Sequence, residues 1–180
     1  MMSWKWIAIA ALPFLLAGAG CDLISGQITI VENFGSGIGT VDGTINQIAV
    51  DLTDNEDYEE HGDKIQSVEA FGFVVEVQNL TGGEATGEGY LSLTNLGLSP
   101  SVETLDSLAT KIFSNMDLPL AIGEIRTVTF EESQDYVLGL DAIEEAVEDG
   151  TFYLYGVTSV PGVKVQYLDF TVIVTVNVEM

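Results

Sequence analysis

Short runs of alternating apolar and polar residues dominate the chain after residue 26. In 70–79 the odd positions carry the large apolar side chains Phe71, Phe73, Val75 and Val77, and in 44–52 the even positions carry Ile48, Val50 and Leu52. A two-residue period is typical of a strand with one face on the core. Comparable runs, rich in Val, Ile, Thr, Phe and Tyr, predict strands near 27–34, 44–52, 64–79, 85–94, 124–131, 151–160 and 163–178.

Glycine-bearing turns separate these strands. Thr81-Gly82-Gly83-Glu84 predicts a hairpin between the third and fourth strands, and Pro161-Gly162 suits a type II turn between the last two. In 163–178 the apolar side chains switch from odd to even positions after Tyr167. A strand changes face only with an extra residue or a bend. We therefore expect a bulge near Tyr167 to Asp169, a place where a sandwich strand can cross between sheets.

Helical features interrupt the strands at three places. The first helix is expected in 141–150. Asp141 is a suitable N-cap residue with Glu144 three positions later, and Gly150 suits the C-terminal end. A second helix is expected in 54–61, ended by Gly62. The segment 101–113 has a stripe of apolar residues at helical spacing, which predicts a helix lying as a lid on the sandwich: Val102, Leu105, Leu108, Ala109 and Ile112.

Taken together, these patterns predict an all-β fold in one domain. The expected architecture is an antiparallel β-sandwich, immunoglobulin-like, with about seven strands and one to three short helices in the connections.

The N-terminus has the three parts of a signal peptide. Lys5 supplies the positive charge, residues 7–16 are nearly all apolar but too few to span a bilayer of ~30 Å, and small residues follow up to the sole cysteine, Cys21. We therefore divide the chain into a signal peptide at 1–20, a tether at 21–26 and the sandwich domain at 27–180.

This arrangement resembles the lipobox of bacterial lipoproteins. Ala19 and Gly20 match the small residues before the modified cysteine, while Gly18 stands where the family usually has Leu. The resemblance implies cleavage before Cys21 and a lipid on its sulfur, which would anchor the domain in a membrane of the bacterial cell envelope, on the periplasmic or the outer-surface face. Each buried CH₂ of such a lipid contributes ~0.8 kcal/mol. The alternative is an ordinary secretory signal with a coincidental cysteine.

Charge and composition exclude several functions. The 180 residues include 28 Asp and Glu against 5 Lys and Arg, a formal net charge of −23. Binding to nucleic acid depends on clustered basic side chains, so we expect no nucleic-acid partner. One His and one Cys cannot form a Cys/His zinc site or an internal disulfide. The acidic surplus also fits a habitat of high ionic strength, where salt screens self-repulsion.

Two groups of residues are candidates for ligand binding. The densest acidic run could supply the oxygen ligands that Ca²⁺ prefers, or it could be a solvated face at a helix N-terminus; its candidate ligands are Asp51, Asp54, Glu56, Asp57 and Asp63. Tyr153 and Tyr155 lie on the same side of one predicted strand. They could form a platform for sugar rings, or pack beneath a neighbouring element.

The sequence contains no recognisable set of catalytic residues. A serine hydrolase needs a histidine base, and the only histidine, His61, is not accompanied by a nucleophile-elbow motif. We therefore expect a non-enzymatic binding or structural module, with an unknown envelope protein or polysaccharide as its partner and no required cofactor. Two alternatives stay open at this point. One is a carboxylate-based glycan hydrolase, and the other is a surface adhesion module supported by Ca²⁺.

Overall fold

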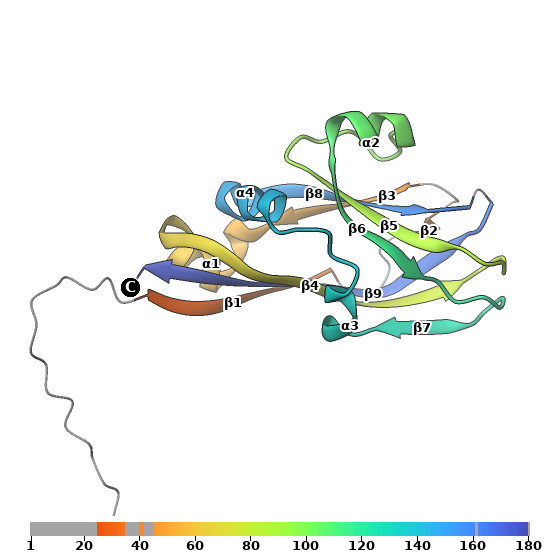
Figure 1. Cartoon of the computed structure of the whole chain (residues 1–180), viewed down its shortest axis with the longest axis horizontal. Helices are drawn as coiled ribbons and strands as arrows, with labels where there is room; N and C mark the ends of the chain where they lie inside the picture. Colours follow the sequence, from red (N-terminus) through yellow and green to blue (C-terminus); the bar gives the residue numbers. More distant parts are fainter. Residues whose placement is uncertain (1–24, 35–39, 42–44, 161, 180) are drawn as a thin grey trace, which may run out of the picture.

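The computed structural model describes residues 25–34, 40–41, 45–160 and 162–179, which form two antiparallel sheets (Figure 1). The first sheet has the order β1-β9-β4-β7, with β2 also paired to β9. Its strands are β1 (Ser25–Asn33), β2 (Thr40–Val41), β4 (Ile65–Asn79), β7 (Ile125–Val128) and β9 (Val165–Glu179). The second sheet has the order β3-β8-β5-β6, from β3 (Ile45–Asp51), β5 (Thr86–Ser92), β6 (Thr110–Asp117) and β8 (Thr151–Thr158).

The predicted antiparallel β-sandwich is confirmed, and its connections follow the jelly-roll order. Without the two-residue β2, the strands run 1-8-3-6 in one sheet and 2-7-4-5 in the other. A jelly roll winds eight strands as two Greek keys, whereas an immunoglobulin domain groups its strands differently. The expected immunoglobulin-like arrangement therefore holds for the two packed sheets but not for the path of the chain.

The two predicted hairpins are wrong, because in each case the two connected strands lie in different sheets. The turn at 81–84 joins β4 to β5, which lie in different sheets, and the turn containing Gly162 likewise joins β8 to β9 across the sandwich. Gly162 does have the positive φ of 87° that suits a turn, whereas Pro161 lies outside the described residues. A turn signal in a sequence indicates that the chain reverses, and it does not indicate which sheet receives the next strand.

The alternating pattern correctly identified the core face of the strands. Phe71, Phe73, Val75 and Val77 are all buried.

The predicted bulge is confirmed, because Glu76 pairs with Asp169 and Val77 with Tyr167, which leaves Leu168 as the extra residue. After the bulge the strand stays in the same sheet, so the possible crossing between sheets does not occur.

Short helices fill the connections. They are η1 (Leu52–Asp54), α1 (Glu56–His61), η2 (Gly62–Lys64), α2 (Val102–Leu108), α3 (Phe130–Gln134) and α4 (Asp141–Asp149). The helix expected over 101–113 ends at Leu108, and its second half is strand β6 with Ile112 in the core. Asp141 does not cap α4, because the N-cap position is Leu140; the C-terminal Gly150 is left-handed, as predicted.

Side chains close the sheet edges where neighbouring strands end. The hydroxyl Oγ of Ser133 in α3 accepts a hydrogen bond of 2.9 Å from the backbone N–H of Phe73, beyond the end of β7. At the opposite edge, Asn55 Nδ2 donates to the carbonyl of Val31 in β1 at 3.2 Å. Both contacts occupy backbone groups that another strand could otherwise bind.

The sandwich has two distinct ends. Strand β1 begins where β9 finishes, since Ser25 pairs with Glu179, and α1, η2 and α4 lie at this end, which we call the base (Figure 1). The opposite end, which we call the tip, consists of 79–85, 118–125, 159–160 and 162–164. Strands β4 and β9 have 15 residues each, so base and tip are about 50 Å apart.

Candidate functional site

The acidic run at the base is not gathered into a metal site. Asp51 Oδ1 accepts hydrogen bonds from Thr53 N at 3.0 Å and Thr53 Oγ1 at 2.6 Å, so it caps η1. Asp54, Glu56 and Asp57 are exposed. Across the described part of the chain, no three His, Cys, Asp or Glu side chains are grouped as a metal ion would require. Asp51 thus serves as a helix cap, and Asp63 is exposed like Asp54, Glu56 and Asp57.

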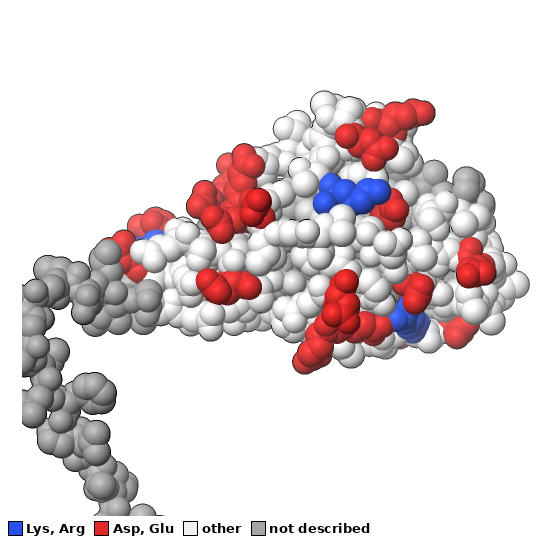
Figure 2. Space-filling model, in the orientation of Figure 1, with Lys and Arg blue, Asp and Glu red and all other residues white. Residues whose placement is uncertain are grey.

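An open hollow of about 650 Å³ does lie at the base, beside α1. Its lining carries the acids Glu59, Glu60, Asp63 and Glu148, together with Thr53, Tyr58, Gly62 and Lys64. Within this lining, the hydroxyl of Tyr58 donates to the Val147 carbonyl at 2.9 Å, and burial raises the pKa of this tyrosine. The hollow is wide, and Figure 2 shows acidic side chains gathered over this end of the molecule.

Tyr153 and Tyr155 do not form an exposed platform. Tyr155 is 1% exposed, and its hydroxyl accepts from Leu96 N at 2.8 Å and Gln47 Nε2 at 3.2 Å. Leu105 of α2 is buried in the same cluster, and Tyr153 packs against it. The packing alternative therefore applies, and α2 covers the outer face of the second sheet as a lid.

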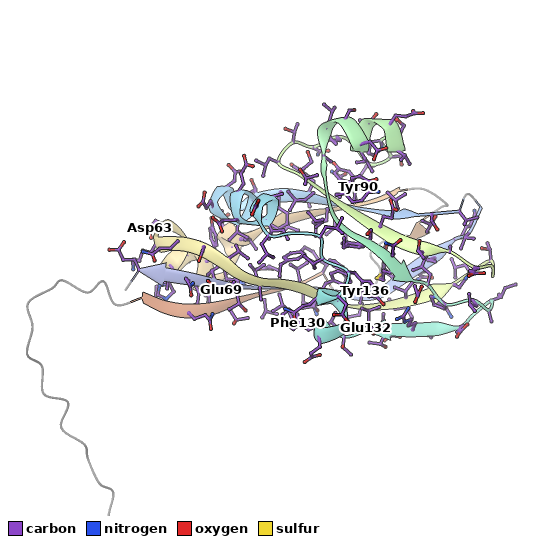
Figure 3. All side chains as sticks on the ribbon, in the orientation of Figure 1. Asp63, Glu69, Tyr90, Phe130, Glu132 and Tyr136 are labelled. Carbon is purple, nitrogen blue, oxygen red and sulfur yellow. The ribbon has the colours of Figure 1, made fainter. Side chains whose placement is uncertain are left out.

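Sequence reasoning missed a polar cluster on that sheet. Tyr90, labelled in Figure 3, donates to Asp106 Oδ1 at 2.9 Å. Lys111 Nζ lies 2.7 Å from Glu88 Oε2 and 5.0 Å from the centre of the Tyr90 ring. The hydrogen bond from Lys111 to Glu88 raises the lysine pKa, and burial raises that of Tyr90. Asp106 thus binds the hydroxyl of Tyr90 and Glu88 binds the ammonium group of Lys111, so both carboxylates have partners and a structural role.

The tip is organised around one buried asparagine. Asn79 is 0% exposed, and its side-chain oxygen accepts from Thr81 N at 3.1 Å and Gly82 N at 2.7 Å. Its amide nitrogen donates to the Pro119 carbonyl at 2.5 Å and, more weakly, to that of Gly83 at 3.4 Å. One side chain therefore joins the loop after β4 to the loop before β7, and a satisfied buried network of this kind holds loops rigidly.

Further hydrogen bonds join the same loops to the turn between β8 and β9. Glu124 Oε2 accepts from Leu120 N at 3.0 Å and Ala121 N at 2.8 Å. Thr81 Oγ1 accepts from Lys164 N at 2.9 Å, and Leu80 N donates to the Lys164 carbonyl at 2.9 Å. The three connections consequently form a single surface.

This tip surface exposes aliphatic side chains. Leu120 is 59% exposed, Ile122 73%, Ile125 49% and Val160 41%. Isolated exposed aliphatic residues are common, but three from the β6–β7 connection beside one from the β8–β9 connection are a candidate interaction surface. The residues Leu118 to Gly123 are almost entirely apolar between two strands, which is the only signal in the sequence that could have indicated this surface.

Comparisons with known proteins give no family for this chain. Neither a family model nor a curated protein matches it. Among solved structures, it resembles one titled infectious bursal disease virus Gx strain, with 12% identity and a TM-score of 0.36 over 89% of this chain and 36% of that one. It also resembles Desmodium yellow mottle tymovirus, with 6% identity and a TM-score of 0.30 over 100% of this chain and 95% of that one.

The chain thus spans only about a third of the length of the first of these viral proteins. Likenesses of this size carry no argument about function, and the fold assignment rests on the strand order itself. No helix in the described ranges is long and apolar enough to cross a membrane.

Proposed function

We propose that this protein is a lipid-anchored, non-enzymatic binding module of the bacterial cell envelope, held by an acylated Cys21 and presenting its tip to a partner. The observation that carries the proposal is the placement of the two ends. Strand β1 starts at Ser25 at the base, four residues after Cys21, whereas the exposed aliphatic side chains lie at the tip.

Only a short segment would join the lipid on Cys21 to the first strand. The chain from Cys21 to Ser25 reaches at most about 14 Å when fully extended. A lipid on Cys21 would therefore keep the base close to the membrane and direct the strands away from it. The tip would then stand about 50 Å from the base, where a partner can reach it.

Intact mass and membrane fractionation test the anchor directly. In cells expressing the wild-type chain, we expect a product cleaved before Cys21, heavier than the bare polypeptide by its acyl groups and found in the membrane fraction. The Cys21→Ala variant should lack the acyl mass and the cleavage. Soluble secretion of both proteins without added mass would overturn the proposal.

The two alternatives predict different results with the same purified protein. Ca²⁺-supported adhesion requires a melting temperature that rises with added Ca²⁺ and falls on chelation. A carboxylate-based hydrolase requires measurable cleavage of envelope or extracellular glycans by the purified protein. The proposed binding module predicts neither result.

A further inference from the structure

We propose that the tip inserts its aliphatic side chains into the surface of an uncharged lipid bilayer facing the membrane that holds the anchor. This inference rests on the proposed function and names the partner of the tip surface. It would make the protein a bridge between two lipid surfaces.

The side chains at the tip suit hydrocarbon. Ile122 and Leu120 are the most exposed of them, and both come from the loop before β7. Ile125 follows on the same connection as the first residue of β7, and Val160 comes from the connection between β8 and β9. The tip segments contain no Trp, Tyr or Arg, the residue types in which protein-binding hot spots are enriched. Aliphatic side chains on loops gain free energy simply by leaving water, and lipid provides that without a shaped pocket.

Several backbone N–H groups of the tip are already hydrogen-bonded within the protein. In hydrocarbon an unsatisfied N–H is costly, so a segment that inserts must satisfy its polar groups internally. The N–H groups of Thr81 and Gly82 bind the Asn79 side chain, and those of Leu120 and Ala121 bind Glu124. Gly83 N donates to the Leu120 carbonyl at 3.0 Å, and Gly123 N to the Asn79 carbonyl at 2.7 Å.

The negative charge of the domain favours an uncharged lipid surface over an anionic one. The chain as a whole has a net charge of −23, yet the tip segments contain only the acids Glu84 and Glu124 and the base Lys164. A second copy of this chain or an anionic bilayer would be repelled by the rest of the domain, whereas a zwitterionic bilayer would not.

The test uses the acylated protein reconstituted into phosphatidylcholine donor vesicles, with flotation to verify anchoring. Fluorescent phosphatidylcholine acceptor vesicles are then added, and clustering is followed by light scattering and co-flotation. We expect wild-type protein to cluster the vesicles and Ile122→Glu to reduce clustering at least tenfold. Leu98→Glu is the matched control, because Leu98 is 78% exposed on the β5–β6 connection, outside the tip, and this variant should cluster like wild type.

Lipid charge provides a second readout in the same assay. Acceptor vesicles with 30% phosphatidylglycerol should cluster less at 10 mM salt and recover at 0.5 M, where the Debye length becomes short. Because Ile122 is exposed, Ile122→Glu should keep the urea midpoint of wild type, which separates loss of binding from loss of folding.

Each other outcome rejects a specific claim. Protein that floats with the donor vesicles but never clusters acceptors overturns the lipid inference and leaves the anchor standing. Protein that does not float with the donors overturns the anchor, and its binding to acceptors from solution then tests the tip directly. Clustering seen only with native envelope vesicles, and abolished when those vesicles are treated with protease, would assign the tip to a protein partner and overturn the inference.

Discussion

The base and the tip complete the same sandwich by different means. At the base, α4 covers the long strands with Ile143, Ala146 and Val147, all buried, and Glu144 Oε2 accepts a hydrogen bond of 3.2 Å from Val68 N in the bulged part of β4. At the tip no helix intervenes, and the side chain of Asn79 takes over the hydrogen bonding of the loops. The base thus depends on apolar burial and the tip on one polar residue.

The largest effect is expected from Asn79→Ala. The variant removes the partner of the buried Pro119 carbonyl and of two part-buried backbone N–H groups, where a fully buried unsatisfied group costs about 1–3 kcal/mol. We expect a loss of about 4 kcal/mol in the free energy of unfolding, measured by urea denaturation. Asn95→Ala is the control. Asn95 Oδ1 also accepts hydrogen bonds, from Gly97 N at 2.8 Å and Gln47 Nε2 at 2.9 Å, but both are exposed to water, so their loss should cost less than about 1 kcal/mol. Equal losses in the two variants would show that Asn79 does not organise the tip.

The base should respond to Ile143→Ala, which removes a fully buried side chain from α4. Large-to-small changes at such positions cost about 2–5 kcal/mol, and we expect about 3 kcal/mol here. Ile122→Ala at the tip is the control of the same chemistry, and it should change stability by less than about 0.5 kcal/mol.

The shape of the Ile143→Ala unfolding curve sharpens the comparison. A single transition with an unchanged urea dependence would mean that base and tip unfold together. Two separate transitions would mean that the helix-covered end is an independent unit.

Between the two ends, Tyr167 at the bulge should make stability depend on alkaline pH. Burial raises the pKa of Tyr167 to about 12. The unfolded chain releases this proton near pH 10, so between about pH 10 and 12 the folded state binds more protons, and stability falls as pH rises. The contribution of this group is about 1.4 kcal/mol per pH unit within that window. Tyr167→Phe should flatten the fall measured by urea denaturation at pH 9 to 11.5, and an unchanged slope would contradict the assignment.

The smallest effect is expected from the acids of the base. Replacing Glu59, Glu60 and Asp63 by Gln, Gln and Asn lowers the density of negative charge around the hollow. In 10 mM salt, where the Debye length is ~30 Å, we expect a rise of a few degrees in melting temperature that disappears in 1 M salt. Glu84→Gln at the tip should produce no such salt-dependent gain. A gain that persists in 1 M salt would show that self-repulsion is not its cause.

The sequence predicted the elements of the fold better than their connections. Alternation around Phe73 and the change of face at Leu168 are local patterns, and both appear in the structure. The stripe from Val102 to Ile112 fitted a helix by spacing, but strand pairing with β5 took its second half. Pairing between strands far apart in the chain depends on tertiary packing, which no local window contains.

The candidate site was harder to predict for the same reason. Asn79 stands in an ordinary turn sequence, and only the approach of the loop containing Pro119, 40 residues later, makes it a central residue. Tyr155 was correctly placed on a strand, but the covering lid containing Leu105 comes from a distant connection. Sites assembled from several loops leave little trace in any one of them.

Two edge contacts of the first sheet bear on association between copies. An open strand edge can pair with the edge of another molecule and join the two into a continuous sheet. Ser133 occupies an edge backbone group of β4 and Asn55 one of β1, so a foreign strand pairing there has to displace a side chain. Each contact is thus an obstacle to edge-to-edge assembly at its own position.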